Sequence, residues 1–147
     1  MAMTGKRITE QMLTEFRRRC RSHGLSITPQ RVAIYSEIAK SREHPCCEDV
    51  FKRVSRTFAD ISLDTVYRTL STFAEVGIVN VVEGYGEAKR YDPDMTAHHH
   101  FRCKRCNTIV DFHDKKYDSL EVPRKFRKGF EVSGIRVVLE GLCDKCA

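Results

Sequence analysis

The sequence predicts an α+β fold in which a helical N-terminal half ends in a β-hairpin and a smaller α/β domain follows. Residues 8–75 hold four segments with apolar side chains at helical spacing. The stretch after Gly77, IVNVVEGYGEAKRYD, is rich in strand-forming residues around a Gly-Tyr-Gly turn, as expected of a hairpin. Two Cys-x-x-Cys pairs in the last third indicate a small domain stabilised by zinc.

Composition is typical of a soluble globular protein. With 147 residues, of which 41% are hydrophobic, the chain can form one ordinary domain or two small ones. No apolar run approaches the roughly 18 residues of a membrane span, and MAMTGKRITEQML lacks the apolar core of a signal peptide. We therefore expect a cytoplasmic protein, whose seven cysteines serve metal or redox chemistry rather than disulfides.

The formal net charge of +6 suggests an acidic partner such as nucleic acid. The excess is spread evenly, with 15 basic and 12 acidic residues over positions 1–93, and 11 and 8 over positions 94–147. Charge alone therefore does not establish DNA binding.

The first expected helix covers residues 8–23, places Leu13, Phe16 and Cys20 on one face, and is stopped by Gly24. The rest of its surface is basic and either is solvated or contacts phosphate. These basic residues are Arg17, Arg18, Arg19 and Arg21.

Two helices then flank a corner. The second begins at Thr28-Pro29, with an N-cap hydroxyl followed by a proline at the first helical position, and buries Ile34 and Ile38. Pro45 disfavours a helical conformation at His44, which therefore lies at the corner between helices. A third helix follows, with Val50, Phe51 and Val54 facing inward.

The fourth expected helix is capped by Ser62 and has two distinct faces. Its apolar stripe consists of Leu63, Val66, Leu70 and Phe73. The opposite face carries Thr65, Arg68, Thr69 and Thr72. Short hydrogen-bonding side chains with one arginine suit close approach to a DNA major groove, whereas a solvated face more often carries several Lys and Glu residues. We favour a recognition helix over a solvated face.

Helices followed by a hairpin form a winged helix-turn-helix, here with one extra helix in front. Pro93 and the small polar residues after it indicate a hinge, so we expect domains at 1–93 and 94–147. In the second, HHHFRC and TIVDF are expected to be strands, and residues 114–122 a short helix stopped by Pro123. Residues 130–143 would form one long strand or a hairpin.

The cysteine spacing is the strongest chemical signal. Cys103 and Cys106 are separated by 36 residues from Cys143 and Cys146. Each two-residue gap lets both thiolates bind one ion, and two such turns close a tetrahedral structural zinc site. Four unrelated thiols or two disulfides are the alternative.

Histidines and aspartates near these cysteines indicate a second metal site. Alternate residues of a strand share a face, so His98 and His100 point together while His99 points away. Asp111 lies on the returning strand and can come alongside them. Nitrogen and oxygen donors together suit iron or manganese. We expect His23, His99 and His113 to be surface or hydrogen-bonded core residues, and spacing alone selects neither His44 nor Asp92.

These motifs resemble the ferric uptake regulator (Fur) family over nearly the full length of the chain. The matching segments are ITPQR (27–31), EHP (43–45), DTVYRTL (64–70), RYD (90–92), HHHFRCKRC (98–106), VDFH (110–113) and LCDKC (142–146). The resemblance implies a metal-dependent, homodimeric winged-helix repressor that binds double-stranded DNA at a palindromic operator. It also implies that the four paired cysteines hold structural Zn²⁺.

The resemblance implies a regulatory site for Fe²⁺ or Mn²⁺ as well. Its ligands here are His44, Asp92, His98, His100 and Asp111. Iron-sensing members tend to carry glutamate at the two acidic positions, whereas the peroxide-sensing PerR branch carries aspartate at both, as this chain does. That branch implies that Fe²⁺ and hydrogen peroxide oxidise a ligand histidine, His44 or His98, and so end repression.

Four residues are the expected DNA contacts: Tyr67, Arg68, Thr65 and, for phosphate, Arg31. Tyr67 flanks the apolar stripe, so a packing role remains open. The basic residue that usually precedes ITPQR is replaced by Ser26, and Ser133-Gly134-Ile135 lacks the histidine of a third metal site, so we expect none. Cys46 and Cys47 are either buried at the start of a helix or reactive there.

Two other functions remain as alternatives. The repressor could sense iron or zinc sufficiency without peroxide chemistry. A zinc hydrolase or thiol redox enzyme is disfavoured, because a four-cysteine site is closed to substrate and the His/Asp set offers no evident nucleophile or general base. We therefore expect that the protein is not an enzyme.

Overall fold

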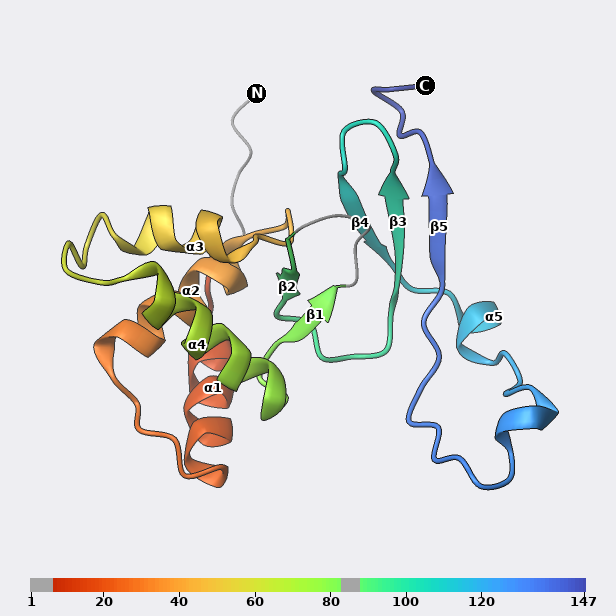
Figure 1. Cartoon of the computed structure of the whole chain (residues 1–147), viewed down its shortest axis with the longest axis horizontal. Helices are drawn as coiled ribbons and strands as arrows, with labels where there is room; N and C mark the ends of the chain where they lie inside the picture. Colours follow the sequence, from red (N-terminus) through yellow and green to blue (C-terminus); the bar gives the residue numbers. More distant parts are fainter. Residues whose placement is uncertain (1–6, 83–87) are drawn as a thin grey trace. The chain divides into compact units, whose positions relative to one another are not determined.

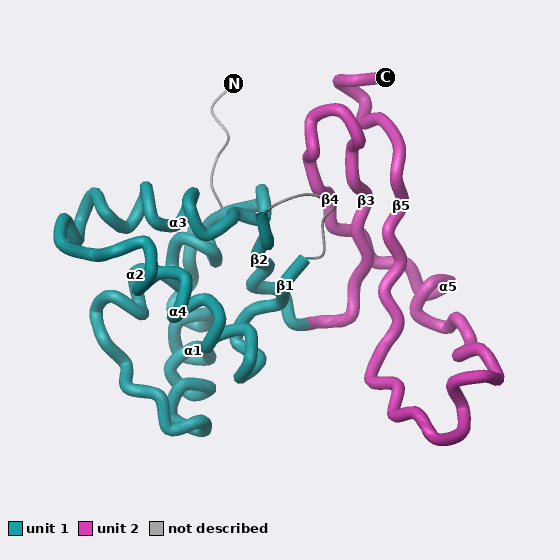
Figure 2. Tube along the Cα trace, in the orientation of Figure 1, with its two compact units in different colours: residues 1–95 teal, residues 96–147 magenta. Residues whose placement is uncertain are grey.

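The computed structural model describes residues 7–82 and 88–147, and the chain separates into two compact units, residues 1–95 and 96–147 (Figure 2). The Gly-Tyr-Gly turn predicted at residues 84–86 lies outside the described residues. None of the helices in the described part of the chain is long and apolar enough to cross a membrane.

The described residues of unit 1 form four helices and a two-stranded sheet (Figure 1). The elements are α1 (Glu10–Ser22), α2 (Pro29–Lys40), α3 (Cys47–Val54), α4 (Leu63–Glu75), β1 (Asn80–Val82) and β2 (Arg90–Asp92). Strands β1 and β2 pair antiparallel, with Asn80 opposite Asp92 and Val82 opposite Arg90. The helices and the antiparallel strand pair predicted for this half are confirmed.

Side-chain caps fix where the helices begin. The Thr28 hydroxyl accepts the N–H of Arg31 at 3.2 Å, and the Ser62 hydroxyl accepts the N–H of Thr65 at 3.1 Å. Each bond satisfies one amide that the first helical turn leaves without an intrahelical partner. Both caps were predicted from sequence.

The core of unit 1 gathers apolar side chains from all four helices. Phe16 of α1 stacks on Tyr35 of α2 with ring centroids 4.4 Å apart, and meets Phe73 of α4 edge-on at 5.5 Å. Leu70 and Val66 of α4 are fully buried. Leu63 is not, and 42% of its surface is exposed. The apolar stripe predicted for α4 is therefore buried at Val66, Leu70 and Phe73 but not at Leu63, in the first turn.

Unit 2 is built on a three-stranded sheet of order β4-β3-β5. The elements are β3 (His99–Cys103), β4 (Ile109–Phe112), α5 (Lys115–Asp118), a 3-10 turn (Arg124–Phe126) and β5 (Val138–Gly141). β3 pairs antiparallel with β4 and parallel with β5. The strand pair around the first Cys-x-x-Cys turn was predicted correctly.

Two predictions for unit 2 were wrong in extent. The last strand covers Val138–Gly141, not residues 130–143, because it runs parallel to β3 with Val138 opposite His100. Val137, directly upstream, still accepts the N–H of His100 at 3.1 Å, but residues 130–137 form no strand in the described structure. The short helix ends at Asp118 rather than Val122, and Ser119 is its C-cap.

Candidate metal centres

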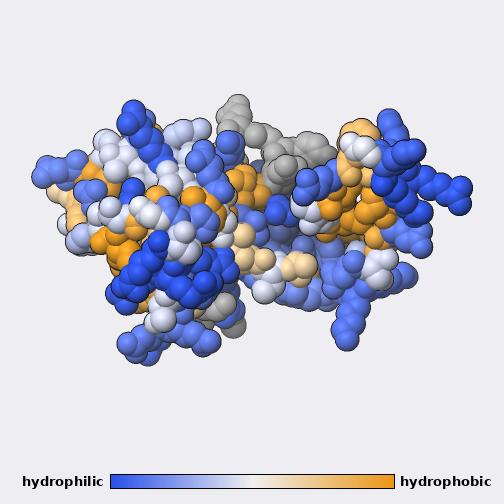
Figure 3. Space-filling model, turned by 90° about the horizontal axis from the view of Figure 1, so that it is seen from below, coloured by the Kyte–Doolittle hydropathy of each residue, from blue (hydrophilic) through white to orange (hydrophobic). Residues whose placement is uncertain are grey.

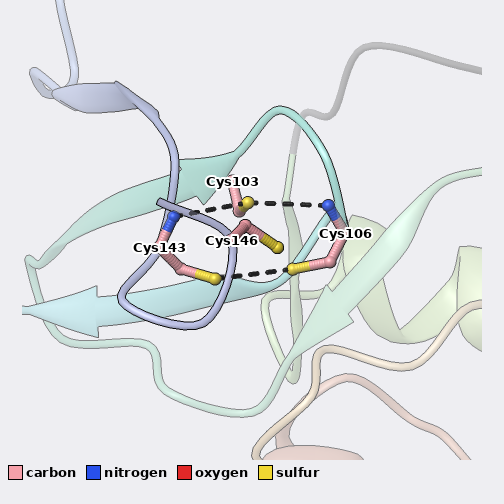
Figure 4. Close-up of side chains that lie close together, drawn as sticks. All are labelled: Cys103, Cys106, Cys143 and Cys146. Atoms are coloured by element: carbon pink, nitrogen blue, oxygen red, sulfur yellow. Dashed lines mark hydrogen bonds between the residues drawn. The ribbon is translucent and has the colours of Figure 1, made fainter.

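The two Cys-x-x-Cys turns lie together at one end of the sheet in unit 2 (Figure 4). Cys103 ends β3, and its register partner on β5 is Gly141, two residues before Cys143. Parallel pairing therefore places both turns at the same end of the sheet, although 36 residues separate them in sequence. The sulfurs of Cys106 and Cys143 lie 3.7 Å apart, and all four sulfurs, including that of Cys146, lie within 4.8 Å of one another.

Hydrogen bonds stabilise the thiolate form of part of this cluster. The Cys103 sulfur accepts the backbone N–H of Cys106 at 3.5 Å and that of Cys143 at 3.4 Å. These bonds lower the pKa of Cys103 to about 6. The adjacent sulfur of Cys143 instead raises the pKa of Cys146 to about 12. The hydrogen bond with the Thr108 hydroxyl lowers the pKa of Cys106 as well. Thiolates at Cys103 and Cys106 are thus favoured and one at Cys146 is opposed, so a bound divalent cation is what would stabilise all four.

Unit 1 brings His44 and Asp92 together. The side chains come from the turn before α3 and from the end of β2, and His44 Nε2 lies 3.3 Å from Asp92 Oδ2. They are only 4% and 2% exposed. The other carboxylate oxygen of Asp92 accepts the N–H of Asp94 at 2.9 Å. A buried carboxylate held against an imidazole is a suitable pair of metal ligands.

Unit 2 brings His98, His100 and Asp111 together. Asp111 on β4 is the register partner of His100 on β3, and its Oδ1 lies 3.0 Å from His100 Nε2 and 3.6 Å from His98 Nε2. The two imidazole rings lie 4.7 Å apart. His98 immediately precedes β3, which begins at His99. Two imidazoles and a carboxylate offer nitrogen and oxygen donors to one ion.

His99 points away from these ligands and is fully hydrogen-bonded. Its Nδ1 accepts the N–H of Val137 at 3.1 Å, so its Nε2 carries the proton and donates to Asp118 at 2.7 Å. His99 is 1% exposed and is the hydrogen-bonded core histidine that strand alternation predicted. Sequence reasoning missed its partner Asp118, because α5 brings that residue to β3 only in the folded unit.

The other two histidines lie at the surface. His23 and His113 are exposed. The ring of His113 lies 5.5 Å from that of His98, at the edge of the ligand group in unit 2.

The candidate DNA-contacting residues lie on α4 and at the start of α2. Tyr67 is 48% exposed, so its side chain is not committed to the core. The Arg68 side chain is 79% exposed and forms an ion pair with Asp64 at 2.9 Å. The Thr65 hydroxyl shares a hydrogen bond with Ser62 at 2.9 Å. Arg31 donates to the carbonyl of Ser26 at 2.7 Å.

The unpaired cysteines lie in unit 1. Cys20 belongs to the core, and Cys47 at the start of α3 is buried. Burial raises the pKa of Cys47 to about 11 and also raises the pKa of Cys46. A thiol with a raised pKa has little thiolate at neutral pH, which disfavours reactivity at both residues. Cys47 is buried, as the first alternative expected, whereas Cys46 is partly exposed.

Comparisons with known proteins agree with this arrangement. Residues 22–140 match the ferric uptake regulator family. The chain is 38% identical over 125 residues to the peroxide operon regulator of Bacillus subtilis, covering 84% of this chain and 86% of that protein.

Two solved structures are similar to the whole fold. One is the ferric uptake regulator from Pseudomonas aeruginosa with manganese, with a TM-score of 0.69 and 27% identity over 87% of this chain and 97% of that one. The other is a zinc-bound manganese uptake regulator, with a TM-score of 0.67 and 27% identity over 87% of this chain and 98% of that one. With its four-cysteine cluster and its His/Asp ligand groups, the chain belongs to the ferric uptake regulator family of metal-responsive transcription regulators.

Proposed function

We propose that the protein is a DNA-binding repressor that requires a regulatory metal and leaves its operator when hydrogen peroxide oxidises a ligand histidine. The observation that carries the proposal is the pair of His/Asp groups, in which every acidic ligand is an aspartate. The similarity to a peroxide operon regulator supports the choice of signal. The protein would act in the cytoplasm, by binding and releasing DNA rather than by turning over a substrate.

Zn²⁺ is the ion proposed for the four cysteines. Four thiolates with no open position suit a structural zinc site, and a solved relative is zinc-bound. The site would stabilise unit 2, whose small sheet leaves much apolar surface exposed.

One Fe²⁺ or Mn²⁺ ion is proposed to bind the two His/Asp groups jointly. Unit 1 offers two ligands and unit 2 offers three, whereas Mn²⁺ commonly takes up to about six donors. The ion would then join the units and fix their orientation. Metal and operator would favour the same conformation, so each must increase the affinity for the other.

The peroxide response follows from the ligand chemistry. Bound Fe²⁺ supplies the redox activity that activates hydrogen peroxide. One peroxide oxygen would be inserted into a ring C–H bond of His44 or His98, and the other would leave as water. The oxidised ring is a poorer ligand, so the two units lose their common ion and the DNA-binding conformation is no longer favoured.

The DNA-binding surface proposed is the exposed face of α4. Tyr67 and Arg68 would contact bases or phosphates in the major groove, Thr65 would approach closely, and Arg31 would contact phosphate. The exposure of Tyr67 and Arg68 supports their role.

Unit 2 is proposed to form the homodimer. Hydrophobic side chains are exposed on this unit, and an apolar area is visible at the right of Figure 3. Such a surface suits a second copy of the chain, which would pair two α4 helices with the half-sites of a palindrome. The exposed side chains are Val110, Leu120, Phe126, Phe130, Val132, Val138, Leu139 and Leu142.

Mass spectrometry tests the proposal directly. The zinc-loaded protein is supplied with Fe²⁺, treated with hydrogen peroxide, digested and compared with a Mn²⁺-loaded control. We expect one added oxygen on the peptide containing His44 or His98 in the Fe²⁺ form only. Oxidation confined to cysteines would overturn the peroxide mechanism.

A metal-sufficiency sensor is the competing function, and Mn²⁺ in a solved relative is consistent with it. The two are separated by release from DNA. A peroxide sensor is released from DNA by peroxide at a constant metal concentration. A sufficiency sensor is released only when a chelator removes the metal, which is tested under anaerobic conditions.

A further inference from the structure

The turn before α3 holds His44 in an unusual backbone conformation. His44 has φ +53°, in the left-handed region that residues with a Cβ rarely adopt, and it precedes Pro45. A residue before proline ordinarily prefers extended backbone. Such a conformation persists only where surrounding contacts hold it, so the question is which contacts do so here.

The side chain of Arg90 reaches this turn from β2. Its Nε donates to the carbonyl of His44 at 2.7 Å, and its Nη2 donates to the carbonyl of Glu43. One planar guanidinium thus binds two consecutive carbonyls, one on each side of the His44 N–Cα bond whose rotation defines φ. This arrangement directly opposes rotation of His44 back to extended backbone.

The rest of β2 is aligned on the same turn. The N–H of Tyr91 donates to the carbonyl of Pro45 at 3.0 Å, and Cys46 forms an isolated antiparallel bridge with Arg90. Alternate residues of a strand share a face, so Arg90 and Asp92 project together. Arg90 contacts the backbone of His44, while the carboxylate of Asp92 lies 3.3 Å from its ring.

Other contacts hold different parts of the turn. The N–H of Glu43 donates to the Ser41 hydroxyl at 3.2 Å, and the Glu43 carboxylate lies 3.9 Å from Arg53. Both act on Glu43, whereas Arg90 acts on the peptides that flank the His44 Cα.

We infer that Arg90 is a positioning residue, whose guanidinium fixes the left-handed turn at His44 and thereby directs the imidazole of His44 to the regulatory metal. The inference rests on the proposed role of His44 as a ligand. Lysine could not replace Arg90, because an ammonium group lacks the planar pair of donors that binds two neighbouring carbonyls. Without them His44 would populate the extended conformation, and the apparent metal affinity would fall with the fraction of the turn that stays competent.

A double-mutant cycle on the full-length, zinc-loaded protein tests this inference. Mn²⁺ affinity is measured by competition with a chelator for the parent protein, Arg90→Lys, His44→Ala and the double variant. We expect Arg90→Lys to weaken Mn²⁺ binding about tenfold, corresponding to a competent fraction of about one tenth. In the His44→Ala background it should have no further effect, since the residue through which Arg90 acts is gone.

Arg53→Lys is the matched control, because it removes a guanidinium beside the same turn without touching the two carbonyls. It should leave the affinity unchanged. Hydrogen exchange of the metal-free protein gives a second readout: the Tyr91 amide, bonded to Pro45, should exchange faster in Arg90→Lys while the amides of α4 do not. If Arg90→Lys fails to fold, Arg90→Gln, which keeps a smaller planar donor, takes its place.

Three results would overturn the inference. Unchanged Mn²⁺ affinity in Arg90→Lys would do so, and so would an equal loss in the His44→Ala background, since Arg90 would then act independently of His44. Either leaves the proposed function intact. Equal Mn²⁺ affinity in the parent protein and His44→Ala would instead remove His44 from the ligands, and the proposed site would fail together with the inference.

Discussion

Asp111 lies directly opposite His100 in the antiparallel pair of β3 and β4, with its carboxylate 3.0 Å from His100 Nε2. The same oxygen is 3.6 Å from Nε2 of His98. Strand register, rather than closeness in sequence, thus places one carboxylate against two imidazoles. Because Asp111 contacts both histidines, we expect its substitution to affect metal binding by unit 2 strongly.

Asp111→Asn should weaken Mn²⁺ binding by at least about tenfold, or roughly 1.4 kcal/mol, because it removes the negative charge while keeping the side-chain volume. Zinc content should not change. Glu131→Gln, which neutralises an exposed acid of the same unit, is the control. Equal Mn²⁺ affinity in the two variants would exclude Asp111 as a ligand.

Cys106→Ser should release zinc and unfold unit 2. Metal binding at such sites contributes on the order of 10 kcal/mol to the free energy of folding. A unit with only a small sheet is not expected to remain folded after losing that contribution. Circular dichroism and zinc content measure the effect. Cys46→Ser makes the same chemical change at the N-cap of α3, where serine is a favoured residue, and should retain zinc and stability. Zinc retained by Cys106→Ser would argue against the four-cysteine site.

His99→Leu should destabilise unit 2 by about 2 kcal/mol, because it leaves the partly buried N–H of Val137 without its acceptor and Asp118 without its donor. Asp118→Asn keeps an oxygen acceptor for His99 and should cost less. Denaturant unfolding of the zinc-loaded protein compares the two variants. If His99→Leu were as stable as the parent protein, these hydrogen bonds would make no net contribution to the free energy of unfolding.

Arg68→Ala should weaken operator binding by about 1–3 kcal/mol if the arginine reads a base. If it contacts only phosphate, the loss of affinity should be similar for all DNA sequences. The slope of log affinity against log salt concentration should then become shallower by about one unit. Fluorescence anisotropy at several salt concentrations, with footprinting, distinguishes these cases. Arg127→Ala removes an exposed arginine of unit 2 that pairs with Glu121 and serves as the control. Unchanged affinity in Arg68→Ala would remove this residue from the interface.

Local signals in the sequence were sufficient for much of the fold. The caps Thr28 and Ser62, the apolar spacing of Val66 and Leu70, and the alternation through His98 and His100 each depend on neighbours within about four residues. Such interactions are decided by helix or strand geometry alone. The same holds for each Cys-x-x-Cys turn, whose two sulfurs are brought together by a short loop.

The sequence by itself therefore determined the helices of unit 1, the hairpin, the strand pair of unit 2 and the chemical types of ligand present. Only the tertiary structure decided that β5 lies parallel to β3 and starts at Val138. It also decided that Asp118 is the hydrogen-bond partner of His99, and that Arg90 donates a hydrogen bond to the carbonyl of His44. These contacts join residues between 19 and 46 positions apart. No local periodicity encodes such pairings, because they arise only when packing of separate elements brings their side chains and backbone groups within hydrogen-bonding distance.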